Sequence, residues 1–140
     1  MGTLGVLARL YEAVARHTAM LDELRERGLR SWVEEFAALH LLQVQAQALI
    51  DMVKRVAAEL GHAPSSSSEA VEVLVAEGIL TREEASFIRR LIGFRNIVVH
   101  EYFGVDMGLV RRVVERGEYR RVAALAAEIL DRARARGVDP

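Results

Sequence analysis

The chain contains no cysteine, so disulfide bonds and thiolate chemistry are excluded. Only two prolines occur, and aromatic residues make up just 6% of the sequence. Alanine, leucine, glutamate and arginine dominate instead, and all four favour helices. A hydrophobic fraction of 51% beside 28% charged residues is typical of amphipathic helices that bury wide apolar stripes. The composition therefore predicts an all-α protein, with enough apolar surface to include an oligomer interface.

Metal-ligand spacing is also missing from the sequence. The four histidines, His17, His40, His62 and His100, lie far apart, and no H-E-x-x-H pattern occurs. We therefore expect no metal site. The chain starts with an amphipathic stretch that soon carries Glu12, which does not resemble a signal peptide. We expect no apolar run of the roughly 18 residues that cross a membrane, and hence a soluble, cytoplasmic protein.

The balance of charges does not by itself indicate a partner. The formal net charge is −1 at pH 7, so no global basic field marks a nucleic-acid binder. Lys54 is the single lysine beside eighteen arginines. Arginine suits phosphate and carboxylate groups, but such a ratio can equally reflect genomic base composition or thermal adaptation.

Helical periodicity divides the chain into five or six segments within one domain, residues 1–140. Two serine or threonine caps precede a glutamate at capping-box spacing, Ser66 with Glu69 and Thr81 with Glu84. We expect helices over residues 4–27, about 31–60, 66–77, 81–100, 107–116 (capped by Asp106) and 119–136. An antiparallel helical bundle is the expected architecture.

The long helix 31–60 has the pattern of a bundle seam. Its mainly apolar positions fall on two seven-residue rows, Leu39, Ala46, Val53, Leu60 and Phe36, Gln43, Ile50, Ala57. A polar row spaced by four residues runs beside them: Gln43, Gln47, Asp51 and Arg55. This row is either a polar edge with an Asp51–Arg55 pair, or a wall in which Gln47 and Asp51 support a site on a neighbouring helix.

The helix 81–100 carries the strongest local anomaly. Its apolar residues fall within an arc of roughly 120°: Ile88, Leu91, Ile92, Val98, Val99 and Tyr102. Arg95 lies at the centre of that arc. A guanidinium buried there alone would cost several kcal/mol, so Arg95 must meet a carboxylate or face a wet cleft that accepts an anion. Asp51 is the natural partner for a structural salt bridge, and both interpretations remain open.

His100 follows Arg95 by five residues, which separates the two by roughly 140° around an ideal helix. They can converge if the helix loosens near Gly104, or if a second subunit supplies the other wall. Asn96 precedes His100 by four residues and can orient it by a hydrogen bond. A histidine at a helix C-terminus also contacts the helix dipole favourably, which is the structural alternative.

The segment 93–102 resembles the signature of HepT-type toxins in the HEPN superfamily. That signature is Arg, a polar residue, three further residues, His, any residue and Tyr. Here Arg95, Asn96, His100 and Tyr102 complete it. The resemblance extends through the long helix and the turn that follows the motif, and covers about residues 30–115.

The resemblance implies a helical homodimer in which two Arg/His motifs meet in a cleft, and RNA cleavage without a metal or other cofactor. In that implied site Arg95 holds the scissile phosphate and His100 transfers protons at neutral pH, while Asn96 and Asp51 position them. An MNT-type nucleotidyltransferase antitoxin is the implied partner. Tyr102 occupies the position that such a partner adenylylates, which would fill the phosphate-binding place with a bulky anion.

Two other functional classes compete with this hypothesis. A catalytically silent interaction module would use Arg95 as a buried ion-pair residue and His100 as a helix cap, and would bind a nucleotidyltransferase partner. An enzyme acting on free nucleotides is disfavoured, because the sequence has no glycine-rich phosphate loop and no carboxylate cluster. The sequence does not specify whether transfer RNA or messenger RNA would be the substrate.

Overall fold

A computed structural model describes residues 5–139, except for the side chain of Tyr102. Within this part of the chain the structure contains six α-helices, one short 3₁₀-helix and no strand. The elements are α1 (Val6–Arg27), α2 (Trp32–Glu59), α3 (Ser67–Ala76), α4 (Arg82–His100), η1 (Tyr102–Gly104), α5 (Met107–Glu115) and α6 (Arg120–Ala135). The predicted all-α class and number of helices are confirmed.

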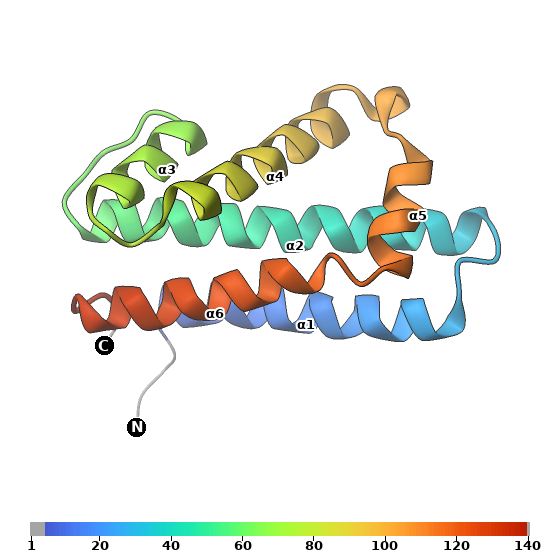
Figure 1. Ribbon diagram of the computed structural model, residues 1–140, viewed down its shortest axis with the longest axis horizontal. Helices are drawn as coiled ribbons and strands as arrows, with labels where there is room; N and C mark the ends of the chain where they lie inside the picture. Colours follow the sequence, from blue (N-terminus) through green and yellow to red (C-terminus); the bar gives the residue numbers. More distant parts are fainter. Residues whose placement is uncertain (1–4, 140) are drawn as a thin grey trace.

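Helix α2 is the centre of the bundle and contacts every other α-helix. In Figure 1, α1 and α6 run along one side of α2, and α3 and α4 lie on the other side. Helix α5 joins the two sides at one end, and α4 rises away from α2 toward its C-terminal end. This central position requires apolar residues around most of the circumference of α2, because neighbours cover it on several sides.

Local capping explains where several helices begin. The hydroxyl of Thr81 accepts a hydrogen bond from the Glu84 amide, and the Glu84 carboxylate accepts one from the Thr81 amide, so the predicted capping box is present. Asp106 accepts a hydrogen bond from the amide of Leu109, as expected for the cap of α5. The capping box predicted at Ser66 is only half right: Ser66 caps α3, but the Glu69 carboxylate binds the neighbouring Ser65 instead.

The expectation that no segment is long and apolar enough to cross a membrane is wrong for α2. Among the described residues, α2 alone reaches the necessary length and mean hydropathy. More than half of that stretch, 56%, is buried inside the bundle, and a core helix meets the same criteria as a membrane span. The apolar character of α2 is therefore accounted for by its central position.

The predicted seam on α2 is buried over most of its length but not at its start. Phe36 is 48% exposed and packs edge-on against Trp32, which is also exposed. Among the described residues, the neighbouring helices do not cover the first turns of α2 on this side. The assignment of Phe36 to the buried seam is therefore wrong. In contrast, Gln45, which belongs to neither predicted row, is only 1% exposed.

Candidate functional site

Arg95 points from α4 toward α2 and α3 and is partly buried there. Its Nη1 donates a hydrogen bond to Oε1 of Gln47 over 3.0 Å, and its Nη2 donates to the Ser67 hydroxyl over 3.4 Å. Its Nε donates to Oδ1 of Asn96 over 3.0 Å. All three acceptors are neutral, so the guanidinium is held in place by groups that leave its charge uncompensated.

The predicted salt bridge between Arg95 and Asp51 is not formed. Gln47 lies between the two residues: its Oε1 accepts from Arg95, and its Nε2 donates to Oδ1 of Asp51 over 2.8 Å. Among the described residues no carboxylate forms an ion pair with Arg95. Asp51 therefore acts on Arg95 only through the amide of Gln47, whose orientation it determines.

Two of the five guanidinium N–H groups of Arg95 have no protein acceptor within the described part of the chain. One belongs to each terminal nitrogen. A phosphate or carboxylate can accept both in a two-point interaction. Arg95 is therefore able to bind an anion. This was one of the two alternatives that the sequence left open for Arg95.

The residues of the polar row on α2 have different partners. Gln47 and Asp51 face the Arg95 network, as expected for a supporting wall. The alternative Asp51–Arg55 pair is wrong, because Arg55 forms its ion pair with Glu59 over 2.7 Å. Both acids lie four residues from Arg55, and Asp51 is already engaged by Gln47.

His100 is the last residue of α4 and is exposed. The helix does not loosen before it, because the Glu101 amide still donates to the Ile97 carbonyl in the normal α-helical pattern. Arg95 and His100 therefore do not converge within one chain. The proposed bond between Asn96 and His100 is likewise not present among the described hydrogen bonds, since Asn96 accepts from Arg95.

The surface beside His100 is apolar and open. Ile97 is 39% exposed, Val99 54% and Phe103 fully exposed. Val99 was predicted to face the core, and this is wrong: the neighbouring Val98 is still buried, but Val99 is exposed where α4 diverges from α2 toward its C-terminal end (Figure 1). Three other members of the predicted stripe are buried: Ile88, Ile92 and Val98.

Ser67, the first residue of α3, contacts Arg95 but is not among the candidate site residues predicted from the sequence. Nothing local marks Ser67 within four consecutive serines, so only the packing of α3 against α4 could reveal it. The backbone of Tyr102 begins η1 directly after α4, and its side chain lies outside the described part of the structure.

An all-α bundle with the Arg-Asn-x₃-His-x-Tyr motif at the end of one helix agrees with the fold that the resemblance to HepT-type proteins predicts. A family model described as ribonuclease HepT-like matches residues 10–129, so the chain belongs to the HepT-like ribonuclease family. A predicted RNase of Archaeoglobus fulgidus is 27% identical over 100 residues, which cover 71% of this chain and 69% of the relative.

Several solved structures share the fold. A crystal structure of a toxin–antitoxin pair with AMP-PNP matches with a TM-score of 0.77 and 17% identity, over 91% of this chain and 98% of the other. The tri-AMPylated HEPN toxin of Shewanella oneidensis, in complex with an MNT antitoxin, matches with 0.74 and 17%, over 88% and 97%. The cytosolic protein YutE of Bacillus subtilis, of unknown function, matches with 0.72 and 17%, over 96% and 92%. At these identities the likeness concerns the fold alone.

Proposed function

We propose that this chain is a metal-independent endoribonuclease toxin, active as a homodimer through the Arg95/His100 motif of its two copies. The observation that carries the proposal is the uncompensated guanidinium of Arg95, which keeps two N–H groups for an anion. Membership of the HepT-like ribonuclease family supports RNA as the source of that anion. In this proposal Gln47, Asn96 and Ser67 orient Arg95 before the substrate arrives.

A second copy of the chain is needed to complete the site. Arg95 and His100 lie on different faces of the same regular helix, so one chain cannot direct both at one phosphate. The exposed apolar side chains of Ile97, Val99 and Phe103 next to the motif supply a contact surface. Pairing at this surface brings the His100 of one copy toward the Arg95 of the other.

The proposed reaction uses the ribose 2′-hydroxyl as the nucleophile. One neutral His100 accepts the hydroxyl proton while the oxygen attacks phosphorus, and Arg95 stabilises the charge that gathers on the phosphoryl oxygens. The His100 protonated in this way then donates the proton to the departing 5′-oxygen. The bond from phosphorus to that oxygen breaks, and the products are a 2′,3′-cyclic phosphate and a free 5′-hydroxyl. No step needs a metal ion or a protein nucleophile.

Regulation by a nucleotidyltransferase antitoxin is the second part of the proposal. Tyr102 lies seven residues beyond Arg95 in the sequence and begins η1, because α4 ends at His100 and Glu101 leaves the helical conformation. Transfer of AMP from ATP to its hydroxyl, with release of pyrophosphate, adds a phosphodiester anion that competes with RNA for Arg95. Relatives of the same fold are crystallised with such antitoxins, one of them in AMPylated form. RNA and ATP both imply a cytoplasmic setting.

A silent interaction module is the second candidate. It is favoured by the separation of Arg95 and His100 within one chain. In that case α4 and its exposed apolar residues would serve only to bind the nucleotidyltransferase. The two candidates differ in whether the purified chain cuts RNA.

The deciding experiment is cleavage of total cellular RNA by the purified full chain in EDTA. We expect the wild type to cut, and Arg95→Ala and His100→Ala to lose at least about a hundredfold in rate. His40→Ala changes an exposed histidine on α2 and should cut like the wild type. Intact RNA with the wild type, or equal cutting by the two site variants, would contradict the proposal and leave the interaction module.

Mixing the inactive variants tests whether the site is shared between copies. In a mixed dimer one site keeps both Arg95 and His100, so refolding Arg95→Ala with His100→Ala should restore about a quarter of the activity. No recovery, with mixed dimers shown to form, would count against a shared site. Tyr102→Phe should keep cutting RNA but should not accept AMP from a cognate nucleotidyltransferase and ATP.

A further inference from the structure

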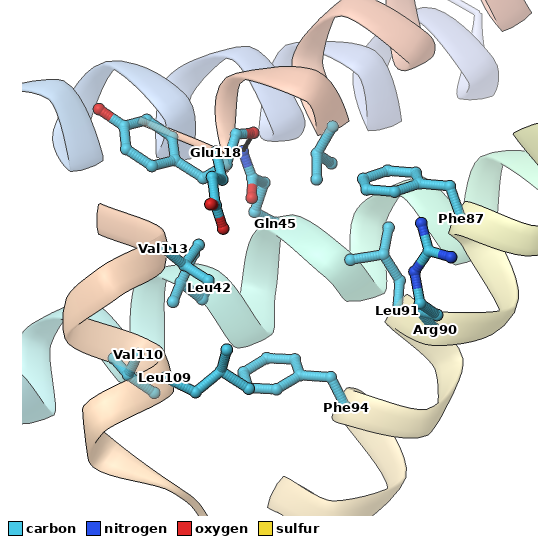
Figure 2. Close-up of a pocket in the computed structure, with 12 residues that line it drawn as sticks. Leu42, Gln45, Phe87, Arg90, Leu91, Phe94, Leu109, Val110, Val113 and Glu118 are labelled. Atoms are coloured by element: carbon cyan, nitrogen blue, oxygen red, sulfur yellow. Dashed lines mark hydrogen bonds between the residues drawn. The ribbon is translucent and has the colours of Figure 1, made fainter. Parts of the chain in front are cut away.

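A pocket of about 250 Å³ lies on the flank of α4 that faces α5 and the start of α6, away from the Arg95 network (Figure 2). Its walls are almost entirely apolar, and Figure 2 shows them converging from α2, α4 and α5. They include Leu42, Leu91, Phe94, Leu109 and Val113. Neither Arg95 nor His100 lines this pocket, so it is separate from the proposed RNA site.

Gln45 is the one uncharged polar side chain that lines the pocket apart from the buried Tyr119, and it is itself only 1% exposed. Its Nε2 donates two hydrogen bonds, to the Thr18 hydroxyl over 2.8 Å and to the Tyr119 carbonyl over 3.1 Å. A carbonyl only accepts, and the Thr18 hydroxyl already donates to the Val14 carbonyl. The nitrogen of Gln45 must therefore face these two groups, which determines where its oxygen points.

The Oε1 atom of Gln45 has no hydrogen-bond partner among the described residues. No side-chain nitrogen or oxygen that is fully enclosed in this part of the chain lacks a partner, so Oε1 opens onto the pocket it lines. A buried acceptor without a donor is costly, and its presence in an otherwise apolar pocket is typical of a binding site with one orienting group.

We propose that this pocket binds a small, neutral, mainly aromatic molecule that donates a single N–H or O–H hydrogen bond to Oε1 of Gln45. Apolar cavities of about 150 Å³ already accommodate benzene, so the larger pocket suits a two-ring molecule such as indole. Arg90 and Glu118 at its edge have opposite charges, which favours a neutral ligand over an ion. A water molecule would satisfy Oε1 but would leave the apolar walls hydrated.

Calorimetric titration of the full-length protein with two molecules of the same shape tests the proposal. Indole carries the N–H donor, and benzofuran replaces it with a ring oxygen. We expect indole to bind with one site per chain, and benzofuran to bind at least about tenfold more weakly, because Oε1 then faces no donor. Failure of indole to bind, or equal affinities for the two molecules, would overturn the proposal.

A pair of variants locates the binding. Leu109→Trp adds bulk at the wall of the pocket, and Met20→Trp makes the corresponding change on α1 outside it. The two parent residues are matched in exposure, 38% and 37%. We expect Leu109→Trp to abolish indole binding and Met20→Trp to retain it, with circular dichroism used to verify the helical fold. Wild-type affinity in Leu109→Trp would place indole elsewhere and overturn the proposal.

Discussion

Arg95 belongs to α4 and Arg132 contacts α4 from α6, but their surroundings are opposite in kind. Arg132, on α6, donates to both carboxylate oxygens of Glu84 over 2.8 and 3.2 Å, and Nη2 also donates to Glu128 over 2.9 Å. Arg95 donates to three neutral oxygens and meets no carboxylate among the described residues. One arginine has its charge balanced by the fold, whereas the other is positioned with its charge left available.

This difference is the basis for the proposal that Arg95 is a functional arginine and Arg132 a structural one. The Glu84 carboxylate joins the start of α4 to α6 through Arg132 and also completes the cap of α4. Pairing of this kind contributes to stability and leaves nothing for a ligand to bind. The Arg95 arrangement lacks that contribution to stability, as expected if Arg95 belongs to the proposed substrate site.

The largest expected effect contrasts the two arginines directly. Arg95→Ala should reduce RNA cleavage at least about a hundredfold with little loss of stability, because no ion pair is broken. Arg132→Ala should leave cleavage unchanged but lower the free energy of unfolding by about 1–2 kcal/mol. Cleavage assays and urea denaturation measure the two quantities. Equal loss of RNA cleavage in Arg95→Ala and Arg132→Ala would contradict different roles for the two arginines.

The next largest effect is expected when Arg95 is given a carboxylate partner like that of Arg132. Gln47→Glu places a carboxylate where the amide oxygen now accepts from Nη1, so it should compete with phosphate and slow cleavage about tenfold. Gln43→Glu adds the same charge one turn earlier on the same row and serves as the matched control. Equal rates of RNA cleavage by Gln47→Glu and Gln43→Glu would contradict this prediction.

A smaller effect concerns the ion pair between Arg132 and Glu84 at the start of α4. Burial raises the pKa of Glu84, but the hydrogen bonds from Arg132 and Thr81 outweigh it and hold the pKa below its usual 4.5. A lowered pKa stabilises the fold above that value, and the contribution disappears as the pH falls through the folded-state pKa. Glu84→Gln should therefore lose about 1 kcal/mol at pH 7 and match the wild type in acid.

Urea denaturation at pH 7 and at several acidic values measures this dependence. Glutamine can still accept the Thr81 amide, so the substitution isolates the charge. Glu128→Gln is the control, because Glu128 binds the same arginine from an exposed position. A stability difference for Glu84→Gln that does not change with pH would show that the ion pair is not its source.

The smallest effect lies in a second paired network, at the start of α6. Burial, reinforced by the hydrogen bond to Asp22, raises the pKa of Tyr119 from 10.0 to about 12. A raised pKa stabilises the fold below pH 10, and this contribution is lost as the pH rises through 12. Tyr119→Phe should thus cost about 1 kcal/mol at neutral pH and little at pH 12.

Ultraviolet absorbance during an alkaline titration checks this prediction directly. The tyrosinate band should show a step near pH 12 in the wild type, and this step should be missing in Tyr119→Phe. Tyr11→Phe, which changes a partly buried tyrosine on α1, should retain it. A wild type in which every tyrosine titrates near pH 10 would contradict the proposed pairing.

Sequence patterns were most informative where the relevant contacts are local. The Thr81–Glu84 box and the Asp106 cap lie within one turn, and both are present as predicted. The same reasoning failed for Phe36 and Val99, whose helical phase suits a buried position. Periodicity specifies which face a residue occupies but not where the covering helix ends.

The Arg95 motif was likewise only partly predictable from the sequence. Its residues and spacing identify the family from the sequence, whereas the sequence left two alternatives for Arg95, and the one with Asp51 as its ion-pair partner is not found. A carboxylate was one alternative, because an ion pair offsets part of the cost of burying a guanidinium. The structure instead uses amide and hydroxyl oxygens, and leaves the charge for a ligand.

The sequence by itself determined the helices, their caps and the family, because these depend on periodicity and on contacts within a few residues. Only the tertiary structure decided what surrounds Arg95, since Gln47 and Ser67 lie 48 and 28 residues away in the chain. It likewise decided that Gln45 would lie buried, with its amide nitrogen satisfied by Thr18 and Tyr119. Such partners meet only when separate helices pack, and the packing depends on the whole bundle rather than on any one segment.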